Sequence, residues 1–158
     1  MNKKLVTYFS ASGATAKLAE KLANAVGADL YEIKPEKAYA PEDLDWTNAK
    51  SRSSMEMNDK TFRPAVKGKV DNIGEYNVIY VGFPIWWYVA PTIVNTFLES
   101  HDLENKKIVL FATSGGSGMG NTVAELKDSC NGKIIDAKRF SQSASEKELK
   151  DWSKKLEA

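Results

Sequence analysis

The sequence predicts an α/β fold of the doubly wound type, a three-layer arrangement in which helices cover both faces of a five-stranded parallel sheet. Short runs of β-branched and aromatic residues alternate along the chain with segments of helical periodicity. The strand candidates are continuously apolar, as in residues 78–83 (VIYVGF), which is typical of parallel strands buried on both faces. The chain has 158 residues, the size of a single domain, so we expect one domain over residues 1–158.

The first elements along the chain follow the order strand, helix, strand. Residues 5–9 form a short apolar run, which predicts a buried strand. Apolar side chains then recur at helical spacing over residues 14–26, and Gly27 suits the end of that helix. Residues 29–34 predict a second strand, which Pro35 ends.

The part of the chain beyond the strand at 78–83 predicts three helices and two strands. Pro91 suits the first turn of a helix, and the spacing of Ser145 and Glu148 is that of a capping box at the start of the last helix. The expected elements are a helix from residue 91, a strand at 108–112, a helix carrying Val123, Leu126 and Cys130 on one face, a strand at 133–137 and a helix from residue 145.

A long segment, residues 36–76, interrupts this alternation. A loop of that length is usually functional or disordered. We expect an ordered excursion over the edge of the sheet, with a short helix around residues 43–50, because large apolar side chains lie within the segment. These side chains are Tyr39, Trp46, Met55, Met57 and Phe62.

The composition excludes several classes of protein. The chain has 22 basic and 21 acidic side chains, which leaves no excess of positive charge for binding nucleic acid. It contains neither the run of about 18 apolar residues that spans a membrane nor the core of a signal peptide, so we expect a cytoplasmic protein. One cysteine and one histidine make neither an internal disulfide nor a His-rich metal site.

The first of three loops that point to a function is residues 10–15 (SASGAT), between the first strand and the first helix. Three hydroxyl side chains and a glycine lie where free backbone amides at a helix N-terminus bind phosphate. The loop contains no lysine, which excludes a nucleotide P-loop. An ordinary strand-to-helix turn with hydroxyl caps remains an alternative.

The other two loops also follow strands. Residues 83–88 (FPIWWY) contain two adjacent tryptophans, which form either a wall for a flat aromatic ligand or a cover for the next helix. Residues 113–120 (TSGGSGMG) contain four glycines, which allow a ligand close to the backbone or form a flexible connection. Open α/β sheets bind ligands where such loops meet, at the carboxyl ends of the strands. Flavin mononucleotide (FMN), with a phosphate at one end and a flat ring at the other, fits all three loops.

These motifs resemble those of the flavodoxin family. The pattern S-x-S-G-x-T at residues 10–15 resembles the family's phosphate loop, T/S-x-T/S-G-x-T, and residues 80–87 (YVGFPIWW) resemble its ring-contacting loop. The resemblance spans nearly the whole chain and is closest to the bacterial flavodoxin-like branch with a long segment after the second strand. It implies FMN as the cofactor and the strand order 2-1-3-4-5, an order that the periodicity alone does not derive.

The resemblance also implies which residues bind this cofactor. It suggests that Arg52 and Glu56, within the long segment, close over the site. The phosphate is assigned to Ser10, Ser12, Gly13, Ala14 and Thr15, and the isoalloxazine ring to Pro84, Ile85, Trp86, Trp87, Thr113, Ser114, Gly115, Gly116 and Gly118.

The chain departs from the better-known electron-transfer flavodoxins in three ways. Its net charge is +1, whereas those proteins are strongly acidic and are steered electrostatically to basic partners. No glycine lies between Ile85 and Ala90, so we expect less stabilisation of a half-reduced flavin, which favours two-electron chemistry. The third loop lacks the tyrosine that often stacks on the outer face of the ring, a role that Tyr88 or Trp46 could take.

Catalysis by side chains alone is not supported, and we assign no catalytic residue. Cys130 falls on the apolar face of a predicted helix, which favours a buried structural thiol. His101 is expected to be a solvated residue at a helix C-terminus. The first loop lacks the cysteine that a low-molecular-weight phosphatase requires. A receiver domain requires acidic residues after the first and third strands, and none follows the strands at 5–9 and 78–83.

Two functions from different classes therefore remain. The first is an electron carrier, a monomer or weak dimer whose bound FMN passes electrons between a reductase and an acceptor protein. The alternative is an enzyme, a flavin-dependent reductase that takes electrons from NADH or NADPH to a quinone-type acceptor. A regulatory flavin-binding module is a weaker third. In each, the cofactor carries the chemistry, which agrees with a chain so poor in reactive side chains.

Overall fold

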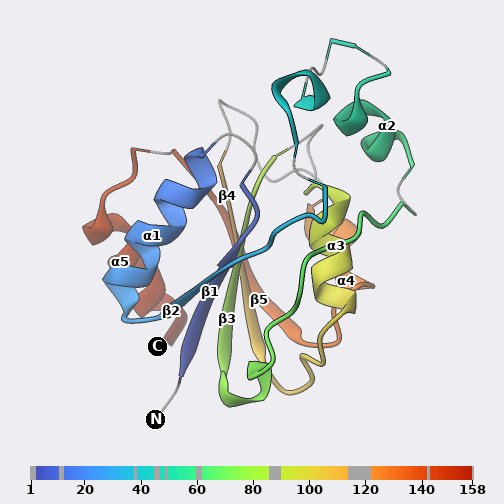
Figure 1. Ribbon diagram of the computed structural model, residues 1–158. Helices are drawn as coiled ribbons and strands as arrows, with labels where there is room; N and C mark the ends of the chain where they lie inside the picture. The colour runs from blue at the N-terminus through green and yellow to red at the C-terminus, as the bar shows by residue number, and fades with distance from the viewer. Residues whose placement is uncertain are drawn as a thin grey trace.

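A computed structural model of the chain has a five-stranded sheet at its centre, in the order β2-β1-β3-β4-β5, with every neighbouring pair parallel (Figure 1). This arrangement confirms the predicted fold class and the strand order that the resemblance implied. The strands are β1 (Lys4–Tyr8), β2 (Asp29–Glu32), β3 (Val78–Pro84), β4 (Lys107–Thr113) and β5 (Lys133–Phe140). The structure describes residues 3–10, 13–37, 39–44, 47–48, 50–59, 62–85, 90–113, 122–141 and 143–157.

Helices cover both faces of the sheet, as Figure 1 shows. One face packs against α1 and α5, and the other against α3 and α4. In the described parts of the long segment between β2 and β3 lie two 3₁₀ helices and α2. The helical elements are α1 (Ala14–Val26), η1 (Pro41–Leu44), α2 (Arg52–Asn58), η2 (Ile73–Glu75), α3 (Thr92–Glu99), α4 (Thr122–Lys127) and α5 (Glu146–Glu157).

The hydrophobic core is divided between the two faces of the sheet. Ile79 packs on the face that carries Phe97 of α3, whereas its neighbour Tyr80 packs on the face that carries Leu18 of α1. Successive residues of a strand point to opposite faces, so a continuously apolar strand supplies both clusters. The parallel pairing of β3 with β4 puts their carboxyl ends at the same edge of the sheet. Because both strands are buried on both faces, these ends are held in fixed positions.

Gly82 makes room for an aromatic ring on the α1 face of the sheet. It is the direct partner of Phe111 in the parallel pairing of β3 with β4. A Cβ atom at residue 82 would lie 2.2 Å from Cζ of Phe111, whose side chain is fully buried. The absence of a side chain at this position therefore leaves room for the far end of the Phe111 ring against β3.

The long segment leaves the body of the protein and returns to it through a short antiparallel pairing. Pro35 and Val66 form an isolated β-bridge. On either side of it, the amide of Glu36 donates to the carbonyl of Ala65 (3.0 Å) and that of Lys67 donates to the carbonyl of Lys34 (2.7 Å). These contacts close the segment at its base, in agreement with the predicted ordered excursion.

The prediction of a helix around residues 43–50 was wrong. The 3₁₀ helix η1 ends at Leu44, and α2 begins only at Arg52. The prediction missed the N-cap of α2. The Ser51 hydroxyl accepts a hydrogen bond from the amide of Ser54, and this cap sets the start of the helix at Arg52.

Cys130 does not lie on a helix, contrary to the prediction, because α4 ends at Lys127. The side chain of Asn95 donates to the carbonyl of Glu125 (3.2 Å), the oxygen that would accept the next helical bond from Ser129. The amide of Ser129 instead donates to the carbonyl of Leu126, three residues back (3.0 Å). Such tightened bonds end the helix.

Among the described residues, no helix combines the length and the apolar character needed to cross a membrane.

Candidate functional site

The carboxyl ends of β1, β3 and β4 lie side by side, and Thr113 at the end of β4 connects the three loops that follow them. Its hydroxyl oxygen lies 2.7 Å from that of Thr15, at the start of α1. Its carbonyl accepts a hydrogen bond from the amide of Ile85, directly after β3 (3.0 Å). The described starts of the three loops therefore lie together at one edge, as expected after adjacent parallel strands.

The start of α1 is built to receive an anion. Gly13, in the left-handed region at φ 96°, precedes the helix, and no side chain of the described residues caps it. The first intrahelical bond of this helix, from the Lys17 amide to the Gly13 carbonyl, spans 3.2 Å, and the amides of residues 14–16 precede it. Such amides, together with the helix dipole, attract negative charge, and no acidic residue in the first turn opposes this.

The space and the hydroxyl groups around this helix start also suit a phosphate. A Cβ atom at Gly13 would meet no other atom within 4 Å, so the surface of the loop is open there. The hydroxyl of Ser10 accepts a hydrogen bond from the Gly13 amide (3.0 Å), which leaves its own proton available for an anionic oxygen. The Thr15 hydroxyl, almost fully buried, is engaged with Thr113 instead.

Part of the predicted ring site is also described. Pro84 ends β3 opposite Thr113, and Ile85 packs half-buried against the core of the α3 face. The remaining predicted residues lie outside the described part of the chain, and their assignments stay predictions. They are Ser12, Trp86, Trp87, Ser114, Gly115, Gly116 and Gly118, together with the stacking candidates Trp46 and Tyr88.

A partly buried polar cluster, in which Glu56 is buried and Arg52 and Tyr39 are half-buried, joins two parts of the long segment. Nε of Arg52 lies 2.8 Å from Oε2 of Glu56, and the Arg52 guanidinium stands 3.8 Å over the ring of Tyr39. The Tyr39 hydroxyl donates to Oε1 of Glu56. Burial and the neighbouring carboxylate raise the pKa of Tyr39 strongly, so this hydroxyl keeps its proton.

Tyr39 was not assigned a role from the sequence, yet it connects the segment to the site. The edge of its ring packs on Phe9, with the ring centroids 5.6 Å apart. Phe9 directly precedes the phosphate loop, so Arg52 and Glu56 are held next to this edge of the sheet. For the pairing of Arg52 with Glu56, the signal in the sequence is their i,i+4 spacing, which brings two side chains together on one face of a helix.

His101 is buried, with 8% of its surface exposed, and the prediction of a solvated histidine was wrong. Its Nδ1 donates to the carbonyl of Phe97 (2.8 Å), and its Nε2 accepts the amide of Val70 (2.9 Å). Burial lowers its pKa, and both ring nitrogens are occupied. The residue therefore fastens the end of the long segment to α3 and is not placed for acid–base catalysis.

The family model of Flavodoxin matches residues 3–156. A solved protein assigned as a flavoprotein from Bacteroides eggerthii is 48% identical, with a TM-score of 0.92 over 100% of this chain and 99% of that chain. A second, from Bacteroides uniformis, is 45% identical, with a TM-score of 0.90 over 97% and 98% of the two chains.

A more distant likeness shows the fold alone. A flavoprotein from Lactobacillus acidophilus, solved in complex with FMN, is 22% identical, with a TM-score of 0.73 over 97% of this chain and 99% of that chain. No curated protein matches the chain. The family match covers nearly every residue and agrees with the strand order and with the open helix start at Gly13. This chain belongs to the flavodoxin family.

Proposed function

We propose that this protein binds FMN at the edge where its three loops meet and carries electrons between partner proteins. The observation that carries the proposal is the position of Thr113, which joins an uncapped helix start to the loops after β3 and β4. Membership of the flavodoxin family supports FMN as the cofactor, as does the FMN-bound flavoprotein from Lactobacillus acidophilus.

The residues at this edge suit the two ends of the cofactor. The amides of Ala14 and Thr15 and the hydroxyl of Ser10 would bind the phosphate, and no lysine or arginine belongs to that loop. Pro84, Ile85 and the loop after Thr113 would flank the ring and exclude water from it. FMN, when bound, supplies reversible electron transfer, and the chain supplies orientation and access.

A carrier role agrees with the side chains that the structure describes. The ring nitrogens of His101 are both hydrogen-bonded within the fold. Burial raises the pKa of the Cys130 thiol, which therefore stays protonated and unreactive near neutral pH. Neither group is poised to act on a substrate. We propose a reductase and an acceptor protein as the partners, and a monomer or weak dimer as the state of the protein.

A flavin-dependent reductase is the second candidate, and two features of the sequence favour it. The absence of glycine between Ile85 and Ala90 favours two-electron chemistry. The net charge of +1 gives weak electrostatic steering toward a protein partner. In that function the chain would take electrons directly from NADH or NADPH and pass them to a quinone-type acceptor.

A first experiment tests the cofactor. Titration of the purified protein with FMN should quench the flavin fluorescence to a stoichiometric end point, with riboflavin, which lacks the phosphate, as the weaker-binding control. A protein that ignores FMN in this titration would refute both candidate functions.

A second experiment separates carrier from enzyme. The FMN-loaded protein is mixed anaerobically with NADH or NADPH in the absence of any other protein, and free FMN with the same nucleotide serves as the control. Loss of the flavin absorption no faster than in the control supports the carrier. Bleaching much faster than the control supports the reductase and contradicts the carrier.

A further inference from the structure

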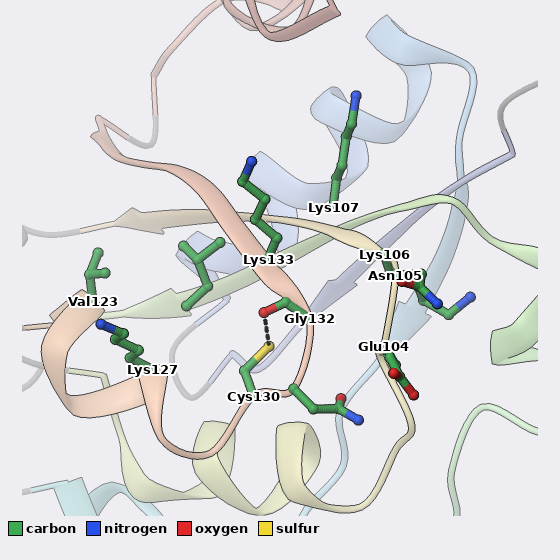
Figure 2. Close-up of a pocket in the computed structure, with 11 residues that line it drawn as sticks. Glu104, Asn105, Lys106, Lys107, Val123, Lys127, Cys130, Gly132 and Lys133 are labelled. Atoms are coloured by element: carbon green, nitrogen blue, oxygen red, sulfur yellow. Dashed lines mark hydrogen bonds between the residues drawn. The ribbon is translucent and has the colours of Figure 1, made fainter.

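The short helix α4 borders open space on one of its sides. A hollow of about 860 Å³ lies beside it, and Figure 2 shows Val123 and Lys127 of the helix among the residues that line it, with Cys130 from the turn that follows. Val123 is 39% exposed, although its side chain is apolar. A helix of six residues that is open on this side depends for its position on the contacts that it makes elsewhere.

Buried hydrogen bonds from α3 hold the end of α4. The side-chain amide of Asn95 donates to the carbonyl of Glu125 (3.2 Å) and to the hydroxyl of Ser129 (2.9 Å). The Ser129 hydroxyl in turn donates to Oε2 of Glu99 (2.6 Å). Asn95 and Ser129 are both buried, so the loss of a partner would leave a polar group unsatisfied away from water. The turn after α4 is therefore fixed to α3.

The same carboxylate of Glu99 also binds the long segment. Nε of Arg63 lies 2.9 Å from Oε1 of Glu99 and Nη2 lies 3.0 Å from Oε2, so the guanidinium meets both oxygens. Such bidentate pairs fix orientation as well as distance. An ion pair as exposed as this one stabilises little by itself, but here its acidic partner is also anchored by the buried Ser129. Arg63 is the main cause of a lowered pKa of Glu99, which therefore keeps its charge near neutral pH.

Glu99 connects two parts of the chain that other side chains hold separately. Among the described residues, the hydrogen bonds of His101 reach the long segment, at Val70, and those of Asn95 reach the end of α4. The hydrogen bonds of Glu99 reach both, from one position at the end of α3. A change at Glu99 should therefore be felt in both parts at once.

Both of these parts border the flavin edge, by which we mean the carboxyl ends of β1, β3 and β4. Tyr39 of the long segment packs its ring on Phe9, directly before the phosphate loop. α4 begins at Thr122, where the connection that leaves β4 at Thr113 ends. A helix that links two parallel strands runs back along the first, so α4 starts at the flavin edge and ends away from it. Glu99 can thus act on the flavin edge from the opposite end of α3.

We propose that Glu99 is a positioning residue for the flavin site. It acts through its partners, holding the long segment by Arg63 and α4 by Ser129, and so it fixes two parts of the chain that border bound FMN. Without this carboxylate, α4 can shift toward the hollow, the long segment loses its ion pair with α3, and FMN leaves the site faster. The inference rests on the proposed function, because it concerns how long FMN stays bound.

Three variants separate the two contacts. Glu99→Ala removes both, Arg63→Met removes the contact to the long segment, and Ser129→Ala removes the contact to α4. The Glu99 side chain is 42% exposed, so its truncation leaves no cavity in the core and the variant should fold. Glu148→Ala, which removes an exposed carboxylate from α5 on the opposite face of the sheet, is the matched control.

The first measurement is amide hydrogen exchange in the protein without FMN. Arg63→Met should accelerate exchange about tenfold in residues 65–70, and Ser129→Ala should do so in residues 123–130. Glu99→Ala should accelerate both regions, while exchange in β3 stays unchanged in every variant because the sheet itself is not loosened. Acceleration of only one region by Glu99→Ala, or of neither, would overturn the proposal.

The second measurement is the rate at which FMN leaves the loaded protein, followed as recovery of flavin fluorescence after a large dilution. It is made at a temperature at which urea denaturation shows every variant to be folded, so a merely structural role leaves the rate unchanged. Arg63→Met and Ser129→Ala should each raise the rate about threefold, and Glu99→Ala about tenfold, because the two contacts contribute independently. Glu148→Ala should not change it.

The outcomes distinguish this inference from the function on which it rests. A wild-type protein that binds no FMN refutes the proposed function, and the inference falls with it. A wild-type protein that binds FMN, together with an unchanged release rate in Glu99→Ala, overturns the inference alone. Faster release from Glu99→Ala than from Glu148→Ala, with exchange accelerated in both regions, supports it.

Discussion

The hydroxyl oxygens of Thr15 and Thr113 lie 2.7 Å apart, although 98 positions separate the two residues along the chain. Both side chains are buried, so the hydrogen bond between the two hydroxyls, in which one donates and the other accepts, is shielded from water. The backbone carbonyl of Thr113 also accepts a hydrogen bond from the amide of Ile85. This one residue therefore links the helix that would bind the phosphate to the loops that would flank the ring.

The Thr15–Thr113 contact should be measurable as a coupling energy. Replacing either residue with valine leaves one buried hydroxyl without a partner, whereas the double replacement removes both. We expect the free energies of unfolding to be non-additive by about 1 kcal/mol in a double-mutant cycle by urea denaturation. Thr113→Ser, which keeps the hydroxyl, is the control, and additive single effects would contradict the prediction.

Ser10→Ala should weaken FMN and leave riboflavin almost unaffected. The Ser10 hydroxyl accepts the Gly13 amide and keeps its proton for an anionic oxygen, and hydrogen bonds to charged groups are worth about 1.5–3 kcal/mol. We expect the dissociation constant of FMN, measured by fluorescence titration, to rise about tenfold or more.

A matched control for this variant is Ser145→Ala. Ser145 likewise accepts an amide, that of Glu148, at the start of α5 (3.1 Å), and its loss should not change FMN affinity. Equal weakening of FMN and riboflavin by Ser10→Ala would argue against a phosphate at this loop.

Gly82→Ala should destabilise the fold. The new Cβ would overlap the buried ring of Phe111, and overpacking of a core typically costs about 1–3 kcal/mol. Gly74→Ala is the control, because a Cβ there meets no atom within 4 Å and the residue does not have a positive φ. Urea denaturation should show a lower midpoint for the first variant and little change for the second.

Stability should fall as the pH drops below about 6.5, the ordinary pKa of histidine. Burial, the facing amide of Val70 and the positive charge of Lys69 disfavour protonation of His101, so its pKa in the folded protein is lowered. Between the folded and unfolded pKa values the unfolded chain binds more protons, and the free energy of unfolding therefore rises with pH.

The measurement for His101 is urea denaturation at intervals from pH 5 to 8. The wild-type protein should lose stability through the lower part of this range, and His101→Gln, which cannot titrate, should show a flatter profile. The same slope in both proteins would show that other groups cause the dependence.

Glu56→Gln should loosen the long segment without unfolding the sheet. It weakens the acceptor shared by Tyr39 and Arg52 while retaining the size of the side chain. We expect amide exchange in α2 to accelerate about tenfold, equivalent to about 1.4 kcal/mol of local stability, and exchange in β3 to stay unchanged. Glu42→Gln, an exposed change in η1, is the control. Equal acceleration in α2 and β3 would indicate global destabilisation instead.

The sequence by itself determined the alternation of strands and helices, and with it the edge where the three loops meet. Periodicity and capping are local properties, so residues 78–83 predict a buried strand without reference to the rest of the chain. Parallel pairing then brings the loops together by geometry alone. Where a cap is strong and easily recognised, as with Gly27 after α1, the end of the helix was predicted correctly.

Only the tertiary structure decided what distant residues do to one another. His101 is buried because Val70 returns from the long segment to contact it, and α4 ends early because Asn95 of another helix takes the carbonyl of Glu125. The meeting of Thr15 with Thr113 and the pairing of Lys107 with Lys133 arise in the same way. Such contacts depend on how distant parts of the folded chain pack together, and no local pattern of residues encodes that packing.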